Sequence, residues 1–196
     1  KAGLAANVSS PVLLLGETGV GKSHMAGLIH RYSGKPGRFV VVDTVAVNEN
    51  LLESEIFGHK KGSFTGAIND KKGLIDEAHQ GTLFFDEIAE VPATFQAKLL
   101  RFIETRQYRA VGDTKEKKAD VRIVAATNKD MNTAIKEKEF RQDLYFRLSV
   151  LKINIPPLRD RFDDIRAMVN EKRQWLKGKE IGPDFWDILF KYQWPG

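Results

Sequence analysis

Short apolar runs alternate along this chain with segments whose apolar residues recur every three or four positions. The runs predict buried strands, and the recurring segments predict amphipathic helices. Five strands are expected, at Val12–Leu15, Phe39–Asp43, Thr82–Phe85, Val121–Ala126 and Val150–Ile155. The fourth run is apolar at nearly every position, which is typical of a strand buried on both faces of a parallel sheet.

Helical spacing accounts for most of the remaining segments. Five helices are expected, at Lys22–Tyr32, Leu51–Phe57, Pro92–Glu104, Phe162–Leu176 and Pro183–Tyr192. The third begins with proline and places four apolar residues on one face, Phe95, Leu99, Leu100 and Ile103. Strands and helices alternate up to Pro156 and Pro157, and only helices follow. This order predicts an α/β domain with a parallel sheet flanked by helices over residues 1–158, and a smaller helical element over residues 159–196.

The most specific motif lies between the first strand and the first helix and reads Gly16-Glu17-Thr18-Gly19-Val20-Gly21-Lys22-Ser23. Its spacing is that of a P-loop, and the strand before it and the helix after it are the context that this motif requires. Its backbone N–H groups would cradle phosphate oxygens at the N-terminus of the helix. Lys22 would reach the outer phosphates, and the Ser23 hydroxyl would ligate Mg²⁺. The alternative is a glycine turn with a chance Lys-Ser pair.

Two acids, Asp86 and Glu87, directly follow the apolar run Thr82–Phe85 in the arrangement known as Walker B. Asp86 would help to hold Mg²⁺, and Glu87 would orient or deprotonate the attacking water. Acids at the carboxyl end of a strand lie where open α/β sheets bind ligands. A glutamate beside the aspartate favours an ATPase over a small-molecule kinase. The alternative is a pair of solvated acids that caps the next helix.

Polar residues also follow the strand Val121–Ala126. The pair Thr127-Asn128 could sense the γ-phosphate of a nucleotide, and the alternative is an ordinary turn capped by the asparagine.

Arg141 and Arg147 are candidates for a second role, because arginines supplied across a subunit boundary stabilise charge on a transferred phosphoryl group. Their spacing of six residues does not place them on one helix face. The alternative is surface ion pairs with Asp143 and its neighbours.

A glycine-rich insertion follows the predicted helix Leu51–Phe57. Gly58, Gly62 and Gly66 oppose a stable helix there, and Phe64 stands among small polar residues. Core packing explains an aromatic on such a loop poorly, so Phe64 is expected to contact a partner. The alternative is an aromatic that folds back onto its own domain.

The segment Gly62-Ser63-Phe64-Thr65-Gly66-Ala67 resembles the GAFTGA loop of the bacterial enhancer-binding proteins, the AAA+ activators of sigma-54 RNA polymerase. Further stretches are similar to the same family, namely Glu53–His59, Gly81–Ile88, Phe140–Leu148, Pro156–Arg161 and Trp194–Gly196. The resemblance therefore extends over nearly the whole chain. It implies an AAA+ fold of the P-loop NTPase class, with residues 159–196 as the start of a small helical lid.

The same resemblance implies roles for the candidate residues. ATP and Mg²⁺ would bind at Gly16–Ser23 and at the pair Asp86-Glu87, with Thr127-Asn128 as the sensor. Arg141 and Arg147 would complete the site of the neighbouring subunit in a ring, typically a hexamer.

The resemblance also implies partners. Phe64 and Thr65 would touch sigma-54 at the tip of the mobile loop, and Arg106–Ala119 would form a second loop on the pore side. ATP turnover would move the first loop and remodel the closed promoter complex. Promoter DNA would lie nearby, and specific DNA binding would belong to a domain outside this chain.

Three positions depart from the family pattern. Ser63 replaces the usual alanine of the loop, and Ser23 stands where many members carry glutamate. Asp43 occupies the place of an asparagine that acts as a switch by pairing with the Walker B glutamate. An aspartate facing Glu87 would repel it unless a proton or a cation intervenes, so Asp43 is expected to couple nucleotide state to the loop differently.

Composition adds limits to these expectations. The 196 residues carry a net charge of +5, a mild basic bias, and contain no cysteine, which excludes disulfides and thiolate metal sites and fits the cytoplasm. No apolar run is long enough to cross a membrane, so no membrane partner is expected. The first residue is Lys1, and the second sensor arginine of the lid is missing, so a piece of a longer protein is expected.

Two other functions remain open beside the sigma-54 activator. One is a different AAA+ machine that acts on nucleic acid or protein, although such a machine has no need of the loop Gly62–Ala67. The other is a nucleotide-gated module that binds sigma-54 and hydrolyses little ATP, which the Asp43 departure keeps open.

Overall fold

The computed structural model of the chain describes residues 2–171 and 182–194. Five strands form one parallel sheet in the order β2-β5-β8-β1-β9. Their bounds are Val12–Leu15 (β1), Phe39–Asp43 (β2), Thr82–Asp86 (β5), Arg122–Thr127 (β8) and Leu151–Asn154 (β9). Each predicted strand is confirmed to within one residue at either end. Because all five run parallel, their carboxyl ends meet at one edge of the sheet.

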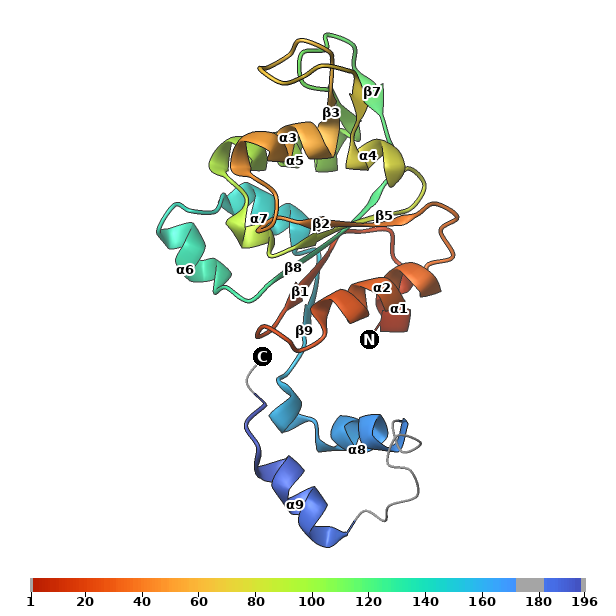
Figure 1. Cartoon of the computed structure of the whole chain (residues 1–196), viewed down its shortest axis with the longest axis vertical. Coiled ribbons are helices and arrows are strands. Elements are labelled where there is room, and N and C mark those ends of the chain that lie inside the picture. Colours follow the sequence, from red (N-terminus) through yellow and green to blue (C-terminus); the bar gives the residue numbers. More distant parts are fainter. Residues whose placement is uncertain (1, 172–181, 195–196) are drawn as a thin grey trace.

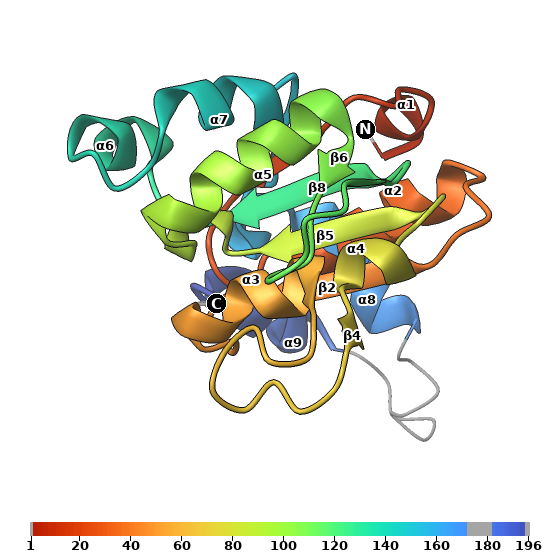
Figure 2. The same ribbon diagram turned by 90° about the horizontal axis from the view of Figure 1, so that it is seen from above.

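Helices cover both faces of this sheet (Figure 2). One face carries α3 (Glu49–Phe57), α4 (Leu74–Glu77), α5 (Ala93–Thr105) and α7 (Gln142–Leu148), and the other carries α1 (Ala2–Ala6) and α2 (Lys22–Tyr32). Alternate residues of the three central strands, β1, β5 and β8, enter the two cores, since successive strand side chains point to opposite faces. Phe85 thus packs with the first group of helices, while Phe84 packs with the second. The predicted α/β class is confirmed.

Two small antiparallel hairpins project beyond α3 and α5 (Figure 1). The first pairs β3 (Gly58–His59) with β4 (Lys71–Lys72), and the second pairs β6 (Gln107–Tyr108) with β7 (Lys117–Lys118). A bridge between His59 and Val111 joins the hairpins. The sequence predicted both regions as loops and missed these short strands.

Two helices at the opposite end of the molecule follow the last strand (Figure 1). A short 3-10 turn, η2 (Leu158–Asp160), leads into α8 (Phe162–Glu171), and α9 (Pro183–Lys191) follows. The rings of Phe162 and Phe190 meet edge to face at 5.2 Å, which packs α8 against α9. The predicted helical element is therefore present, although residues 172–176 of its first helix and Pro195-Gly196 lie outside the described residues.

Two further short elements are η1 (Ile88–Glu90) and α6 (Met131–Lys136). The sequence did not predict α1, α4, α6 or α7, each of seven residues or fewer, because such segments give too little periodicity to recognise. Helix α5 begins at Ala93, with Pro92 as its N-cap, one residue later than predicted. Within residues 2–171 and 182–194, no helix combines the length and apolarity needed to cross a membrane.

Candidate nucleotide-binding site

The predicted P-loop connects the end of β1 to the start of α2, at the carboxyl edge of the sheet. Gly19 and Gly21 adopt φ values of +78° and +95°, which side-chain-bearing residues rarely take. A Cβ on Gly16 would lie 2.6 Å from the carbonyl oxygen of Ile155. Glycine is therefore required where the chain turns and where it passes the segment after β9.

Lys22 lies at the centre of this loop, with a side chain that is only 6% exposed. Its Nζ donates hydrogen bonds to the carbonyl oxygens of Gly16, at 3.1 Å, and Glu17, at 3.2 Å. The same ammonium lies 3.2 Å from a carboxylate oxygen of Glu87. A buried cation within a loop of backbone amides fits an anionic ligand such as a phosphate chain.

Of the two Walker B acids, Glu87 contacts this cation and Asp86 contacts the adjacent Ser23, and neither side chain caps a helix. The Ser23 hydroxyl donates to Oδ2 of Asp86 at 3.0 Å, and Glu87 makes no cap hydrogen bond to η1 although it precedes that turn. Glu87 also adopts a left-handed conformation, with φ at +54°. The alternative interpretation as solvated capping acids is wrong.

Oxygen ligands of the kind that Mg²⁺ prefers are thus present as Ser23 and Asp86. In the part of the chain that the structure describes, no group of three or more His, Cys, Asp or Glu residues could hold a metal ion. These two side chains therefore fit a cation that takes its remaining ligands from a nucleotide and from water.

The predicted sensor pair completes the hydrogen-bonding network. The backbone N–H of Asn128 donates to Glu87 at 3.0 Å, and its side-chain amide donates to the Thr18 hydroxyl at 2.9 Å. Thr127, the last residue of β8, is fully buried, and its carbonyl oxygen accepts from the N–H of Gly16. Asp130 caps α6, so the alternative role of Asn128 as that cap is wrong.

Asp43 ends β2 opposite Asp86 in the sheet register. Its carboxylate accepts hydrogen bonds from the backbone N–H groups of Val45 and Ala46, each at 3.1 Å. The neighbouring Thr44 donates its hydroxyl to the carbonyl oxygens of Asp86 and Glu87, each at 2.8 Å. The sequence reading missed this link from β2 to the Walker B segment. A switch role for Asp43 against Glu87 stays a prediction.

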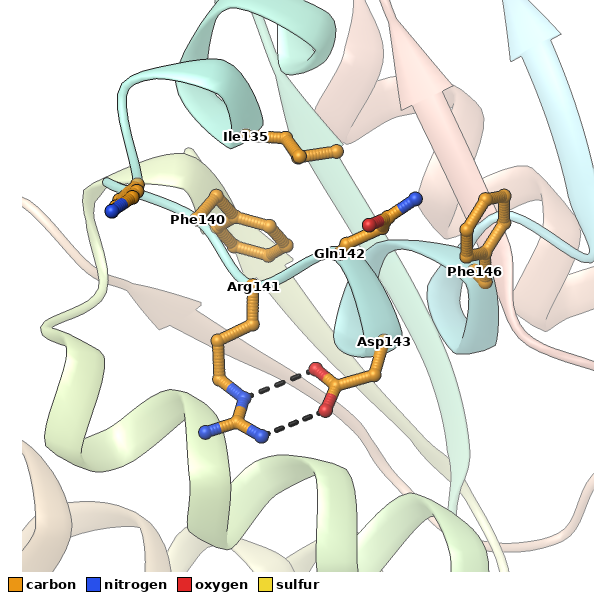
Figure 3. A pocket seen from close by; sticks show the side chains of 7 residues that line it. Ile135, Phe140, Arg141, Gln142, Asp143 and Phe146 are labelled. Atoms are coloured by element: carbon orange, nitrogen blue, oxygen red, sulfur yellow. Dashed lines mark hydrogen bonds and ion pairs between the residues drawn. The ribbon is translucent and has the colours of Figure 1, made fainter.

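The two candidate arginines lie on and beside α7. Figure 3 shows the Arg141 guanidinium facing Asp143, with contacts of 3.0 and 2.7 Å, and Arg147 pairs with Glu104 of α5 at 3.0 Å. The hydrogen-bonded Asp143 carboxylate raises the pKa of Arg141, and the guanidinium lowers the pKa of Asp143. Both arginines thus form the surface ion pairs of the alternative interpretation within one chain.

Neither arginine contacts the P-loop or the Walker B acids among the described residues, so a role at a neighbouring subunit stays a prediction. The segment that carries Arg141 is fixed by a buried residue that the sequence reading missed. Gln96 of α5, with no exposed surface, accepts from the N–H of Arg141 at 2.8 Å and donates to the carbonyl oxygens of Val91 and Glu139.

The loop with the GAFTGA-like sequence folds back on its own hairpin. Phe64 is half-buried, and its ring meets His59 edge to face at 5.0 Å. Ser63 lies against Gly112 of the second hairpin, where an added Cβ would come within 2.5 Å of the serine Cβ. The remaining loop residues, Gly62, Thr65 and Gly66, are exposed, while Ala67 is buried. The folded-back alternative for Phe64 therefore describes this structure, and its contact with a partner stays a prediction.

Three further arginines have contacts that the sequence reading did not anticipate. Arg159 pairs with Glu17, and Arg161 donates to the carbonyl oxygen of Val20. Arg122 of β8 is buried beneath α1 and donates to the carbonyl oxygens of Ala5 and Ala6. The stretch Pro156–Arg161 contributes only a family resemblance at the level of sequence. The burial of Arg122 could have been expected, because it is a charged residue inside an otherwise apolar strand.

Comparison with known proteins places this geometry in a family. The family model described as "Sigma-54 interaction domain" matches residues 1–154. The chain is 45% identical over 199 residues to the Nif-specific regulatory protein of Rhizobium leguminosarum bv. trifolii, covering 98% of this chain and 56% of that protein. It is 43% identical over 192 residues to the regulatory protein AtoC of Escherichia coli K12, covering 94% of this chain and 42% of that protein.

Among solved structures, the crystal structure of NtrX from Brucella abortus in complex with ATP is similar, with a TM-score of 0.87 and 34% sequence identity. The match covers 100% of this chain and 46% of that one. The chain thus spans about half the length, or less, of the relatives it matches. Since one family model accounts for residues 1–154 and these relatives align along almost its entire length, the chain belongs to the family of sigma-54 interaction domains.

Proposed function

We propose that this chain binds and hydrolyses ATP, and that the turnover drives activation of sigma-54 RNA polymerase. The observation that carries the proposal is the convergence of a buried Lys22 with Ser23, Asp86 and Glu87 at the carboxyl edge of the sheet. Membership of the sigma-54 interaction family supports the partner. ATP as the nucleotide is supported by NtrX, a relative whose structure contains ATP.

Binding would begin with an exchange of partners at Lys22. Its ammonium now contacts Glu87 and two carbonyl oxygens of the loop, and it would transfer these contacts to the outer phosphates. Glu87, once released, would orient or deprotonate the attacking water. The Thr127-Asn128 pair lies between the P-loop and Glu87, which suits it to respond to the γ-phosphate.

Mg²⁺ is proposed as the metal. Ser23 and Asp86 would hold it together with phosphate oxygens of the nucleotide. When bound, the ion would neutralise charge that develops on the phosphoryl group during transfer.

The active assembly is proposed to be a ring, typically a hexamer. Arg141 and Arg147 are exposed on the surface around α7 and have no contact with the nucleotide site of their own chain in the described part. In a head-to-tail ring, this surface would face the site of the next subunit. The arginines would then exchange Asp143 and Glu104 for the phosphates of a neighbour.

Sigma-54 is proposed to bind the loop Gly62–Ala67, with Phe64 and Thr65 as the contacts. Phe64 rests on His59, a T-shaped contact that a partner surface could replace. The second hairpin would lie on the pore side beside it, because the bridge from His59 to Val111 joins the two. ATP turnover would move the loop and remodel the closed promoter complex.

The chain is proposed to comprise an ATPase subdomain over residues 1–158 and the start of a helical lid over residues 159–196. Sequence-specific contact with promoter DNA would come from outside these residues. A domain that works on RNA polymerase would act in the cytoplasm.

The alternative is a nucleotide-gated module that binds sigma-54 with little hydrolysis. Asp43 favours it, because an asparagine is usual at this position and an aspartate would repel Glu87 once Lys22 turns to a phosphate. Replacing Asp43→Asn should then raise ATP turnover. An unchanged rate would show that Asp43 does not alter the coupling between nucleotide state and the loop Gly62–Ala67.

The decisive experiment measures ATP hydrolysis per chain against chain concentration, together with binding to purified sigma-54 for the wild type and for Phe64→Ala. We expect turnover per chain to rise with concentration, and sigma-54 binding to be lost in the variant. A rate that stays near zero with ATP still bound would support the gated module. Undiminished sigma-54 binding by Phe64→Ala would contradict the proposed contact.

A further inference from the structure

The segment that leaves the last strand contacts the P-loop through two arginines. Arg159 donates from both terminal nitrogens to the Glu17 carboxylate, at 2.9 and 2.5 Å, which is a bidentate pair. Arg161 donates to the carbonyl oxygen of Val20 at 3.0 Å. These contacts arise because β9 pairs in parallel with β1, so the segments that follow the two strands leave the sheet side by side.

The pairing continues past the strands themselves. The N–H of Ile155 donates to the carbonyl oxygen of Leu15 at 2.8 Å, and the Ile155 carbonyl passes so close to Gly16 that no Cβ would fit there. The position of Arg159 relative to Glu17 is therefore set by the sheet and does not depend on the flexible ends of the two side chains alone.

Glu17 is the only acidic residue in the loop Gly16–Ser23. Its own carbonyl oxygen accepts a hydrogen bond from Lys22, so the residue forms part of the cradle for the phosphates. Only two methylene groups and the Cα separate its carboxylate from the backbone that forms this cradle. That reach is shorter than the Debye length of about 8 Å at physiological ionic strength, so the carboxylate would repel a triphosphate. Hydrogen bonding to Arg159 lowers the pKa of Glu17, so protonation does not remove the charge near neutral pH.

We propose that Arg159 is a positioning residue for nucleotide binding, which acts by cancelling the negative charge of Glu17 at the edge of the phosphate loop. The inference rests on the ATP binding proposed above. Exposed ion pairs contribute little to folding stability, and these side chains are 34% and 50% exposed. The effect of the pair should therefore appear in nucleotide affinity and leave thermal unfolding nearly unchanged.

The test is a double-mutant cycle with charge-neutral substitutions of similar shape, Arg159→Gln and Glu17→Gln, singly and together. The affinity of the chain for ATP would be measured by isothermal titration calorimetry at low and at high salt. Arg159→Gln should weaken ATP binding by roughly 3- to 10-fold at low salt, because Glu17 is left uncompensated. Glu17→Gln should instead tighten it by roughly 2-fold, because Arg159 is freed beside the phosphates.

The double variant should return to within about 2-fold of the wild type, and all differences should shrink in high salt. A matched control is Arg38→Gln. Arg38 forms a similar exposed pair with Glu77, at 3.2 Å, but precedes β2 and so lies at the amino edge of the sheet. This variant should bind ATP as the wild type does.

If the wild-type chain binds ATP, three results would overturn this inference alone. If both single variants weaken binding, the ion pair serves to hold the loop in its conformation and does not act by cancelling charge. If the double variant stays as weak as Arg159→Gln, the arginine itself contacts the phosphates. Equal affinities for all four proteins would leave the pair without a role in binding. A wild-type chain that binds no ATP would overturn the proposed function, and this inference with it.

Discussion

Single side chains in this protein are held by partners that a ligand would replace. Lys22 and Glu87 form an ion pair at 3.2 Å, so the buried Lys22 ammonium is not left without an opposite charge. A phosphate that captured Lys22 would leave Glu87 without its cation, which would link nucleotide binding to the freedom of the Glu87 side chain.

His30 lies outside the nucleotide site, and its protonation is expected to affect the stability of the fold. The buried Arg122 lies in β8, and the neighbouring His30 of α2 shares a 3.0 Å hydrogen bond with the Thr82 hydroxyl. Burial, and to a lesser degree the charge of Arg122, lower the pKa of His30 below its ordinary value of 6.5. The folded chain therefore resists protonation of His30 more than the unfolded chain does.

This difference predicts the pH dependence of unfolding. As the pH falls below about 6.5, His30 becomes protonated in the unfolded chain at a higher pH than in the folded chain. The free energy of unfolding should therefore fall. The stabilising contribution of neutral His30 to the free energy of unfolding is fully present above that pH. Urea denaturation of the wild type and of His30→Gln at several pH values measures this contribution. The stability advantage of the wild type should shrink toward acid pH, and an advantage that grows would contradict the assignment.

At the scale of elements, α5 connects the sheet to the surface that carries the arginines. Its apolar face was predicted, and Phe95, Leu99 and Ile103 are buried as expected, while Leu100 packs at the margin. Gln96 lies on the same helix with no exposed surface and makes three hydrogen bonds to backbone groups. A polar residue among apolar ones thus fixes the path of the segment before α7.

Replacing Gln96→Leu should leave those three backbone groups unsatisfied. We expect a loss of about 1–3 kcal/mol in the free energy of unfolding. ATP turnover should fall further than ATP affinity, since Arg141 is displaced while the P-loop is untouched. Denaturant unfolding and steady-state kinetics measure the two effects. Lys98→Gln, an exposed change on the same helix, is the control and should alter stability by less than about 0.5 kcal/mol. Equal stability of Gln96→Leu and the wild type would show that water replaces the lost bonds.

At the scale of the whole molecule, the nucleotide site and the arginine surface lie on different parts of one chain. A ring would bring them together, whereas an isolated chain would not. The proposal therefore predicts complementation between two inactive variants, Lys22→Ala and Arg141→Ala. Mixed in equal amounts, they should recover about a quarter of the wild-type ATPase rate, because some neighbouring pairs combine an intact Lys22 with an intact Arg141.

Each variant alone, at the same total concentration, is the control for this mixture. A mixed rate no greater than the sum of the separate rates would indicate that the arginine acts within its own chain, or that no ring forms.

The sequence by itself determined the α/β class, the five parallel strands and the P-loop with its Walker B acids. These features are local, since buried strands need apolar runs and a phosphate cradle needs glycines at fixed spacing. The resemblance carried by Gly62–Ala67 and its companion motifs identified the family, which the comparisons confirmed. The sequence did not determine whether Phe64 folds back onto its own domain, because its contact with His59 depends on how the loop packs against the hairpin.

Only the tertiary structure decided which charges compensate one another. Glu17 and Arg159 are 142 residues apart, and Asn128 and Thr18 are 110 apart. Arg122 reaches carbonyl oxygens 116 and 117 residues away. No local pattern encodes such pairs, because they depend on the order of strands in the sheet, in which β9, the last strand along the chain, lies beside β1, the first. The spacing of residues along the chain specifies which chemical groups each motif supplies. The order of strands in the sheet determines which of these groups come into contact.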